Sequence, residues 1–141
     1  MPPAEVFLCH SSQDGDFTAR LAATLRAHGV PVWYSATNIL GAQLWHDEIG
    51  TALKRCDWFL LVLSPSAVES SWVKLELMFA LNQPRFMGRI VPALLGACDH
   101  SSLSWTLSAF QIIDFSRSFE AGCRQLLRAW GLGFASSESA P

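Results

Sequence analysis

Clustered positive charge is missing from this sequence. Only two of its 10 basic residues are lysines, Lys54 and Lys74, and the arginines are scattered. With Lys+Arg at 10 and Asp+Glu at 12, the formal net charge is -2. Nucleic acids and anionic membranes are bound through clustered positive charge, so we expect neither as a direct partner.

Metal-ligand spacing, a signal peptide and a membrane-spanning run are missing as well. The cysteines form no CxxC pair and match no zinc spacing with histidine. Met1–Glu5 lacks the basic start and apolar core of a signal peptide, and no apolar run approaches the ~18 residues that cross a bilayer. We therefore expect a cytoplasmic protein with no bound metal and with reduced, mostly buried thiols. The thiols are those of Cys9, Cys56, Cys98 and Cys123.

What is present is a regular alternation of short apolar runs and amphipathic segments. With 141 residues, 50% of them hydrophobic and 16% charged, the chain is expected to form one globular domain. Apolar runs predict strands at 6–9, 30–34, 58–63, 90–95 and 112–115. Helical spacing predicts helices at 17–28, 44–55, 66–81 and 119–130. This order predicts an α/β fold, a flavodoxin-like five-stranded parallel sheet in the order 2-1-3-4-5 with helices on both faces.

Two details complete this expected organisation. Pro92 lies inside the fourth strand, in conflict with the assignment, because proline removes a hydrogen-bond donor from a sheet. From Gly131 onward the sequence turns small and polar. We therefore expect the domain at residues 1–131 and a tail, or the start of a linker, at 132–141.

The most informative stretch is Ser64–Glu76, which directly follows the third predicted strand. A strand that runs into a Ser-Pro turn and then a helix puts that turn at the carboxyl end of the sheet, where open α/β folds bind ligands. We expect one helix here, with Ser66 and Glu69 as a capping box. Trp72 and Glu76 are four residues apart, so they share one face of that helix. An aromatic ring one turn from a carboxylate suits a ligand in which a flat ring is attached to a sugar.

Six motifs, in this order along the chain, resemble the Toll/interleukin-1 receptor (TIR) domain in its bacterial form. The opening box is VFLCHSSQD at 6–14, the second strand GVPVWY at 29–34, and the next loop and helix begin NILGAQL at 38–44. The third strand ends LVLSP at 61–65, the following helix carries SWVKLE at 71–76, and the fourth strand is IVPALL at 90–95. The family tolerates the proline in that fourth strand. The resemblance covers nearly the whole chain.

The resemblance implies an activity and a set of residues. Catalytic TIR domains cleave NAD⁺ at the nicotinamide–ribose bond, so that NAD⁺ is a substrate and no cofactor is needed. The family's catalytic glutamate matches Glu76, and the aromatic residue that stacks on the nucleotide in some members matches Trp72. Ser35 stands where an acidic residue usually follows the second strand, and the loop up to Gly41 differs slightly in length from that of some relatives. The full set of expected substrate contacts is Trp72, His10, Ser11, Ser35, Gly41 and Trp45.

A single carboxylate is sufficient for this chemistry. Nicotinamide is already a cationic leaving group, so no general acid is needed to expel it. What remains is to stabilise an oxocarbenium-like ribose, as a carboxylate does in glycoside cleavage. A carboxylate that faces such a pocket is expected to contribute little to the stability of the fold.

Structural roles remain open for the same residues. Glu76 is also compatible with a solvated helix position, and Trp72 with a place in the core. His10 and Ser11 fit a simple cap and turn equally well. Trp45 fits either a hydrophobic anchor or a contact with a neighbouring domain.

Two functional classes follow from the sequence. The first is an NAD⁺ glycohydrolase, with or without cyclase activity, that is activated by self-association in an immune or cell-suicide system and fused to a sensor or oligomerising domain. The alternative is a non-catalytic module that signals through TIR–TIR assembly by the loop around Gly41. A response-regulator-like domain is disfavoured, because its acidic pair and acceptor aspartate would fall at Cys9-His10 and Ser64-Pro65. Linear ADP-ribose, a cyclic isomer and a base-exchange product are all compatible with the sequence.

Overall fold

Five short strands form a parallel sheet at the centre of the described structure, in the order β2-β1-β3-β4-β5. The computed structural model describes residues 2–34 and 42–135. The strands are β1 (Val6–Cys9), β2 (Val32–Trp33), β3 (Trp58–Leu63), β4 (Ile90–Leu94) and β5 (Ile113–Asp114). Each pair of neighbouring strands is parallel, so the predicted α/β fold and its strand order are confirmed.

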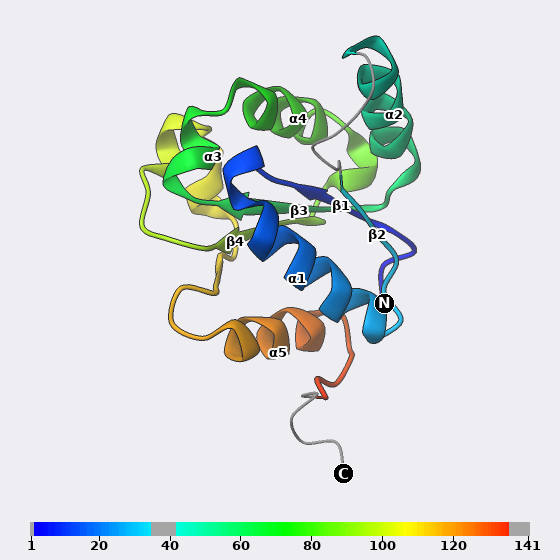
Figure 1. Ribbon diagram of the computed structural model, residues 1–141, viewed down its shortest axis with the longest axis vertical. Helices are drawn as coiled ribbons and strands as arrows, with labels where there is room; N and C mark the ends of the chain where they lie inside the picture. The colour runs from blue at the N-terminus through cyan, green and yellow to red at the C-terminus, as the bar shows by residue number, and fades with distance from the viewer. Residues whose placement is uncertain (1, 35–41, 136–141) are drawn as a thin grey trace.

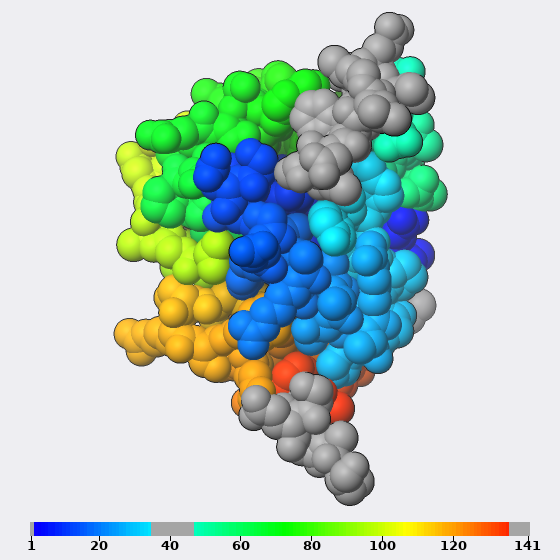
Figure 2. Space-filling model, viewed as in Figure 1, coloured from blue at the N-terminus to red at the C-terminus, as the bar shows by residue number. Residues whose placement is uncertain are grey.

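Helices cover both faces of this sheet (Figure 1). On one face lie α1 (Gly15–Ala27) and α5 (Phe119–Ala129), and on the other α2 (Ala42–Arg55), α3 (Pro65–Glu69) and α4 (Ser71–Leu81). Short 3-10 helices occur at η1 (Ser12–Asp14), η2 (Pro84–Phe86), η3 (His100–Ser102) and η4 (Trp105–Ala109). Figure 2 shows the blue segment of α1 at the surface between the green segment of α3 and α4 and the orange α5. Within the described ranges, no helix has both the length and the apolar character needed to cross a membrane.

The alternation of side chains along the strands divides the core into two layers. Phe7 and Cys9 of β1 pack with α2, α3 and α4, whereas Val6 and Leu8 pack with α1 and α5. All residues of Phe59–Leu63 in β3 are fully buried. Because this central strand is covered by helices on both faces, its sequence is continuously apolar instead of alternating.

Pro92 fits into β4 because its nitrogen faces β5, and β4 pairs with β5 only after this residue. The N–H of Leu95 donates to Leu63 O of β3 at 2.8 Å, whereas Leu94 O accepts from Phe115 N–H at 2.8 Å on the β5 side. Since the backbone groups of successive residues point to opposite neighbours, Pro92 faces β5, as Leu94 does. Pairing of β4 with β5 begins one residue after the proline. The proline therefore removes no donor from the ladder between β3 and β4.

The prediction of one continuous helix at 66–81 is wrong, because two helices occupy this stretch. Ser70 has an extended backbone (φ −85°, ψ 118°) and separates α3 from α4. The hydroxyls of Ser64 and Ser70 cap the two helices, each accepting from the backbone N–H three residues on, at 3.1 and 3.2 Å. Ser66 lies inside α3, so the predicted capping box of Ser66 and Glu69 is also wrong: a serine at the true N-cap precedes each helix.

The second strand is shorter than the sequence predicts, because Val30 belongs to the end of α1. Its N–H donates to Leu25 O at 3.0 Å across Gly29, which has a φ of 82°. This bond and the positive φ form the Schellman ending of a helix, for which glycine is favoured. Pairing with β1 therefore starts only at Val32.

The chain beyond α5 folds back along α1. The ring of Phe134 stacks on His28, with centroids 5.4 Å apart and 18° between the planes. The N–H of Ala135 donates to His28 Nε2 at 2.9 Å. Residues 136–141 lie outside the described structure, and the domain boundary after residue 131 stays a prediction.

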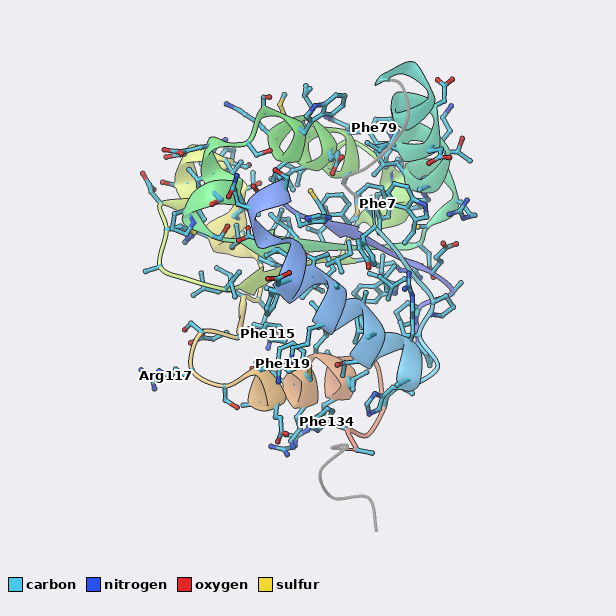
Figure 3. All side chains as sticks on the ribbon, viewed as in Figure 1. Phe7, Phe79, Phe115, Arg117, Phe119 and Phe134 are labelled. Atoms are coloured by element: carbon cyan, nitrogen blue, oxygen red, sulfur yellow. The ribbon has the colours of Figure 1, made fainter. Side chains whose placement is uncertain are left out.

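Gly122→Ala is expected to destabilise the domain by about 1–3 kcal/mol, because α5 packs closely on Phe115. A Cβ at Gly122 would overlap the ring of Phe115. Phe115 is buried and held edge-on by Phe17, next to Phe119 (Figure 3), so its ring has little room to move. This overlap outweighs the roughly 1 kcal/mol that alanine gains over glycine inside a helix.

Gly50→Ala in α2 is the matched control for this prediction. Nothing lies within 4 Å of a Cβ added at Gly50, so this variant should be more stable than the wild type by about 0.5–1 kcal/mol. Urea unfolding of both variants measures the two effects. Equal stabilisation by both substitutions would contradict the close packing of α5.

Candidate functional site

Glu76 lies on α4, close to the carboxyl end of β1. β1 and β3 are adjacent and parallel, so their carboxyl ends lie at the same edge of the sheet. α4 packs against β1, and the Ser70 cap fixes where this helix begins. Glu76 therefore lies in the layer beside β1, on the side of α4 that also carries Val73 and Leu77, and is only 8% exposed.

The Glu76 carboxyl titrates far from its ordinary range. Burial raises its pKa from 4.5 to about 7, and the neighbouring Cys9 thiol partly offsets this rise. Cys9 Sγ also lies 4.0 Å from Val73 O. Burial, followed by the charge of Glu76, raises the pKa of the Cys9 thiol well above its usual range. Across the described residues, no cation forms an ion pair with Glu76, and such a perturbed carboxyl at a ligand-binding edge is a candidate functional group.

A hydrogen bond joins the turn after β1 to the turn after β3. Ser64 Oγ donates to an Asp14 carboxylate oxygen at 2.5 Å while it accepts from the N–H of Ala67 at 3.1 Å. Asp14 precedes α1 but makes no side-chain cap there, because its carboxylate reaches across to Ser64 instead. The two turns that border the carboxyl edge of the sheet are thereby held together.

His10 and Ser11 form the start of the first of these turns. Ser11 is buried and caps η1 by accepting from the N–H of Gln13 at 3.2 Å. His10 Nδ1 lies 2.8 Å from Ser11 O, so this nitrogen carries the proton, because a carbonyl can only accept. The His10 ring lies edge-on to Tyr34, with centroids 6.0 Å apart. The sequence left a capping role open for Ser11, and the structure shows it. Contacts of His10 and Ser11 with a substrate remain a prediction.

Trp72 lies in the first turn of α4, four residues before Glu76, and is 37% exposed. This exposure argues against the core position that the sequence left open. Leu75 and Met78 follow at three-residue spacing and are also exposed. The three side chains form an apolar row along the outer side of α4.

Three of the predicted contacts cannot be placed against this geometry. Ser35 and Gly41 lie outside the described residues. Trp45 belongs to α2, but its side chain lies outside the described part of the chain. Cys9, which adjoins Glu76, directly precedes the turn at His10–Ser11.

The sequence did not single out Cys9 or the pair of Asp14 and Ser64. For Cys9 a signal existed, because it ends a strand and lies two residues after Phe7, which places both side chains on one face of the sheet. That this face also receives Glu76 depends on the packing of α4 against β1, which no local pattern predicts. The partnership of Asp14 with Ser64 likewise depends on two turns fifty residues apart in the chain.

The family model for the TIR domain matches residues 6–127 of this chain. The 2′ cyclic ADP-D-ribose synthase BtTIR of Bacteroides thetaiotaomicron is 31% identical over 74 residues, which are 52% of this chain and 26% of that protein. The NAD(+) hydrolase PdTIR of Paracoccus denitrificans is 32% identical over 77 residues, which are 54% of this chain and 26% of that protein. The matched segments thus span about a quarter of the length of these curated relatives.

Solved structures show the same fold at lower sequence identity. The TIR domain of the Toll-related receptor TRR-2 from Hydra magnipapillata superposes with a TM-score of 0.72 at 17% identity, covering 89% of this chain and 97% of that one. The TIR domains of the activated Roq1 resistosome superpose with a TM-score of 0.66 at 15% identity, covering 89% of this chain and 98% of that one. With the family match over residues 6–127, these findings show that the chain belongs to the TIR domain family.

Proposed function

We propose that this TIR domain is an NAD⁺ nucleosidase that cleaves the nicotinamide–ribose bond, with Glu76 as its catalytic carboxylate. The observation that carries the proposal is the burial of Glu76 beside the carboxyl end of β1, without an ion-paired cation among the described residues. A buried carboxylate kept for structure alone is expected to be ion-paired and well hydrogen-bonded. The distant relatives named as an NAD⁺ hydrolase and a 2′ cyclic ADP-D-ribose synthase support the same chemistry.

In the proposed reaction, the bond between ribose C1′ and the nicotinamide nitrogen breaks. Its electron pair goes to the positively charged pyridinium ring, which leaves as neutral nicotinamide, and positive charge develops on C1′ and the ring oxygen of the ribose. The ionised form of Glu76 stabilises this charge, and its burial strengthens the attraction because screening is weaker in a low dielectric. Water then adds to C1′ and loses one proton to give ADP-ribose, whereas a nucleophile within the same molecule gives a cyclic product.

The other parts of the proposal come from the family resemblance and the position of the turns. The domain acts in the cytoplasm, in an immune or cell-suicide response, and works when copies associate through a fused sensor or oligomerising domain. Besides Glu76, the residues proposed to contact NAD⁺ are Trp72, His10, Ser11, Ser35, Gly41 and Trp45.

The direct test is chromatography of NAD⁺ incubated with the protein over a wide range of protein concentrations. We expect release of nicotinamide together with ADP-ribose or a cyclic isomer, and a specific activity that rises with concentration. Unchanged NAD⁺ at the highest concentration, and after fusion to an oligomerising partner, would overturn the proposal. Full activity in the dilute monomer would support the nucleosidase activity but contradict its activation by assembly.

Trp72→Ala is expected to lower kcat/KM for NAD⁺ by about tenfold or more, because stacking of a base on an aromatic ring contributes about 1–3 kcal/mol. Trp72→Phe should retain part of the activity, since a smaller ring still stacks. Met87→Ala, at an exposed apolar position outside α4, is the matched control and should leave kcat/KM unchanged. Circular dichroism checks the fold: if both Trp72 variants unfold the domain, the tryptophan belongs to the core and the stacking role is wrong.

A second candidate function is a non-catalytic interaction module, favoured by the apolar row of Trp72, Leu75 and Met78 on α4. Contiguous exposed apolar side chains of this kind are typical of protein–protein contacts. The TIR domains of the resistosome neighbour favour a second copy of this domain as the partner. Both candidate functions predict association of copies. Only the nucleosidase proposal predicts that the protein turns over NAD⁺ and that removing the charge of Glu76 abolishes this turnover.

A further inference from the structure

The turn between β1 and α1 is held together by hydrogen bonds that converge on Ser11. Ser11 O accepts from the ring of His10 at 2.8 Å and from the N–H of Asp14 at 3.0 Å. Ser11 Oγ accepts from the N–H of Gln13 at 3.2 Å. Residues 10–14 therefore form one local unit, which carries His10 and Ser11, two of the proposed contacts with NAD⁺.

The side chain of Asp14, at the end of this unit, reaches a different turn. Ser64 Oγ lies 2.5 Å from an Asp14 carboxylate oxygen and 3.1 Å from the backbone nitrogen of Ala67. A carboxylate accepts and a backbone N–H donates, so the Ser64 hydroxyl donates to Asp14 and accepts from Ala67. Ser64 is only 3% exposed, so water competes little for this charge-assisted bond.

Asp14 makes this bond in place of the one that its local position favours. It is the N-cap residue of α1, where aspartate is preferred because its side chain can accept an N–H of the first helical turn. Within the described part of the chain, Asp14 forms no such side-chain bond to α1. A residue that leaves its local role for a long-range contact indicates a constraint from elsewhere in the fold, and such departures are expected at functional sites.

Ser64 is a firm attachment point for this carboxylate. It directly follows the buried strand β3, and its carbonyl oxygen accepts from the N–H of Val68 at 3.1 Å in the first turn of α3. The helix after α3 is α4, which carries Glu76. The bond from Ser64 to Asp14 therefore fixes the turn of residues 10–14 relative to the segment that leads to the proposed catalytic carboxylate.

We propose that Asp14 is a positioning residue of the nucleosidase site: its carboxylate, by accepting from Ser64, fixes the turn that presents His10 and Ser11 to NAD⁺. This inference rests on the proposed function. Asp14 acts through the turn and forms no bond to the substrate. Its contribution is one of orientation, and a displacement of about 1 Å in a substrate contact can lower the rate by about 100-fold.

The experiment compares kcat/KM for NAD⁺ in the wild type, Asp14→Ala, Asp14→Asn and Asp16→Ala, under conditions in which circular dichroism shows each protein to be folded. Asp14→Ala should lower kcat/KM by about tenfold or more, because the turn loses its attachment to Ser64. Asp14→Asn should stay within about threefold of the wild type, since the amide oxygen still accepts from the Ser64 hydroxyl. Asp16→Ala is the matched control: it removes an exposed carboxylate in the first turn of α1 and should leave kcat/KM unchanged.

Ser64→Gly tests the same bond from its other end. Glycine has no hydroxyl to donate but is tolerated at an N-cap, so this variant should lose activity as Asp14→Ala does. Adding Asp14→Ala to Ser64→Gly should change kcat/KM by less than about twofold, because the two residues act through one bond. Additive losses would show that Asp14 acts elsewhere and would overturn the proposal. If one single variant fails to fold, the other alone tests the loss of activity; unfolding of both would assign the bond to the fold and overturn the positioning role.

NMR order parameters of the backbone amides at residues 11–14 supply a second readout that needs no turnover. They should fall in Asp14→Ala and Ser64→Gly but not in Asp14→Asn or Asp16→Ala. An unchanged turn in Asp14→Ala, or a more mobile turn with unchanged kcat/KM, would overturn the positioning role. If the wild type does not turn over NAD⁺, the nucleosidase proposal fails, whereas lower order parameters in Asp14→Ala would still sustain the attachment of the turn to Ser64.

Discussion

Glu76→Gln is expected to lower the kcat for NAD⁺ cleavage by roughly 100-fold or more, with little change in KM. Glutamine keeps the shape and volume of glutamate but not its charge, so the variant loses the attraction for positive charge that develops on the ribose. That charge exists in the transition state and hardly in bound NAD⁺, which is why kcat is affected more than KM. Removing one preorganised electrostatic contact of this kind typically lowers kcat by about 100- to 1,000-fold.

Glu69→Gln is the matched control for this prediction. Glu69 lies at the end of α3, exposed to solvent and only seven residues before Glu76, so its replacement removes the same charge from the neighbouring helix. We expect it to leave turnover close to that of the wild type. The kcat of both variants is measured as the rate of nicotinamide release at saturating NAD⁺, with chromatography as the detection method. A Glu76→Gln protein with full activity would refute the catalytic assignment.

Most of the fold is predictable because the apolar runs are short, continuous and separated by helical segments. β1 and β3 begin and end where their apolar runs do, at Val6–Cys9 and Trp58–Leu63. The break between α3 and α4 was not predictable in the same way. Several serines in this stretch can each cap a helix, and which of them does so depends on how the chain leaves β3 and reaches the side of β1.

The candidate site, too, was only partly predictable from the sequence. The placement of Trp72 and Glu76 on one helix follows from their spacing, which is local information. The contact of Glu76 with Cys9 requires β1 and α4 to pack together, although they are more than sixty residues apart in the chain. Burial of Glu76 also changes the expectation that its replacement leaves stability unaffected, because a buried carboxyl without an ion pair disfavours its own charged form.

The stability of the domain is expected to fall with rising pH in the range where Glu76 ionises. The folded pKa of Glu76 is about 7, against an ordinary value of 4.5. Between these values the folded state binds more protons than the unfolded state, so the free energy of unfolding decreases as the pH increases. At about 1.4 kcal/mol for each unit of pKa difference, the loss from this one group is on the order of 3 kcal/mol and is complete above about pH 8.

Glu76→Gln should remove this dependence, because an amide has no proton to lose in this range. The two proteins should differ little near pH 4.5, where Glu76 is neutral in the folded state, and the variant should be more stable by a few kcal/mol near pH 8. Other titrating groups are common to both proteins and cancel in the difference. The charge that is proposed to stabilise the ribose therefore lowers the stability of the fold, as is often found for active-site groups.

Urea unfolding of the wild type, Glu76→Gln and Glu69→Gln at several pH values between about 4.5 and about 8.5 tests this prediction. The gap in free energy of unfolding between Glu76→Gln and the wild type should widen as the pH rises through 7. The curve for Glu69→Gln should run parallel to that of the wild type, because Glu69 is exposed. A gap that stays constant across this range would mean that the Glu76 carboxyl is as well solvated in the folded domain as in the unfolded chain. That result would contradict its burial beside Cys9, and with it the electrostatic basis of the proposed site.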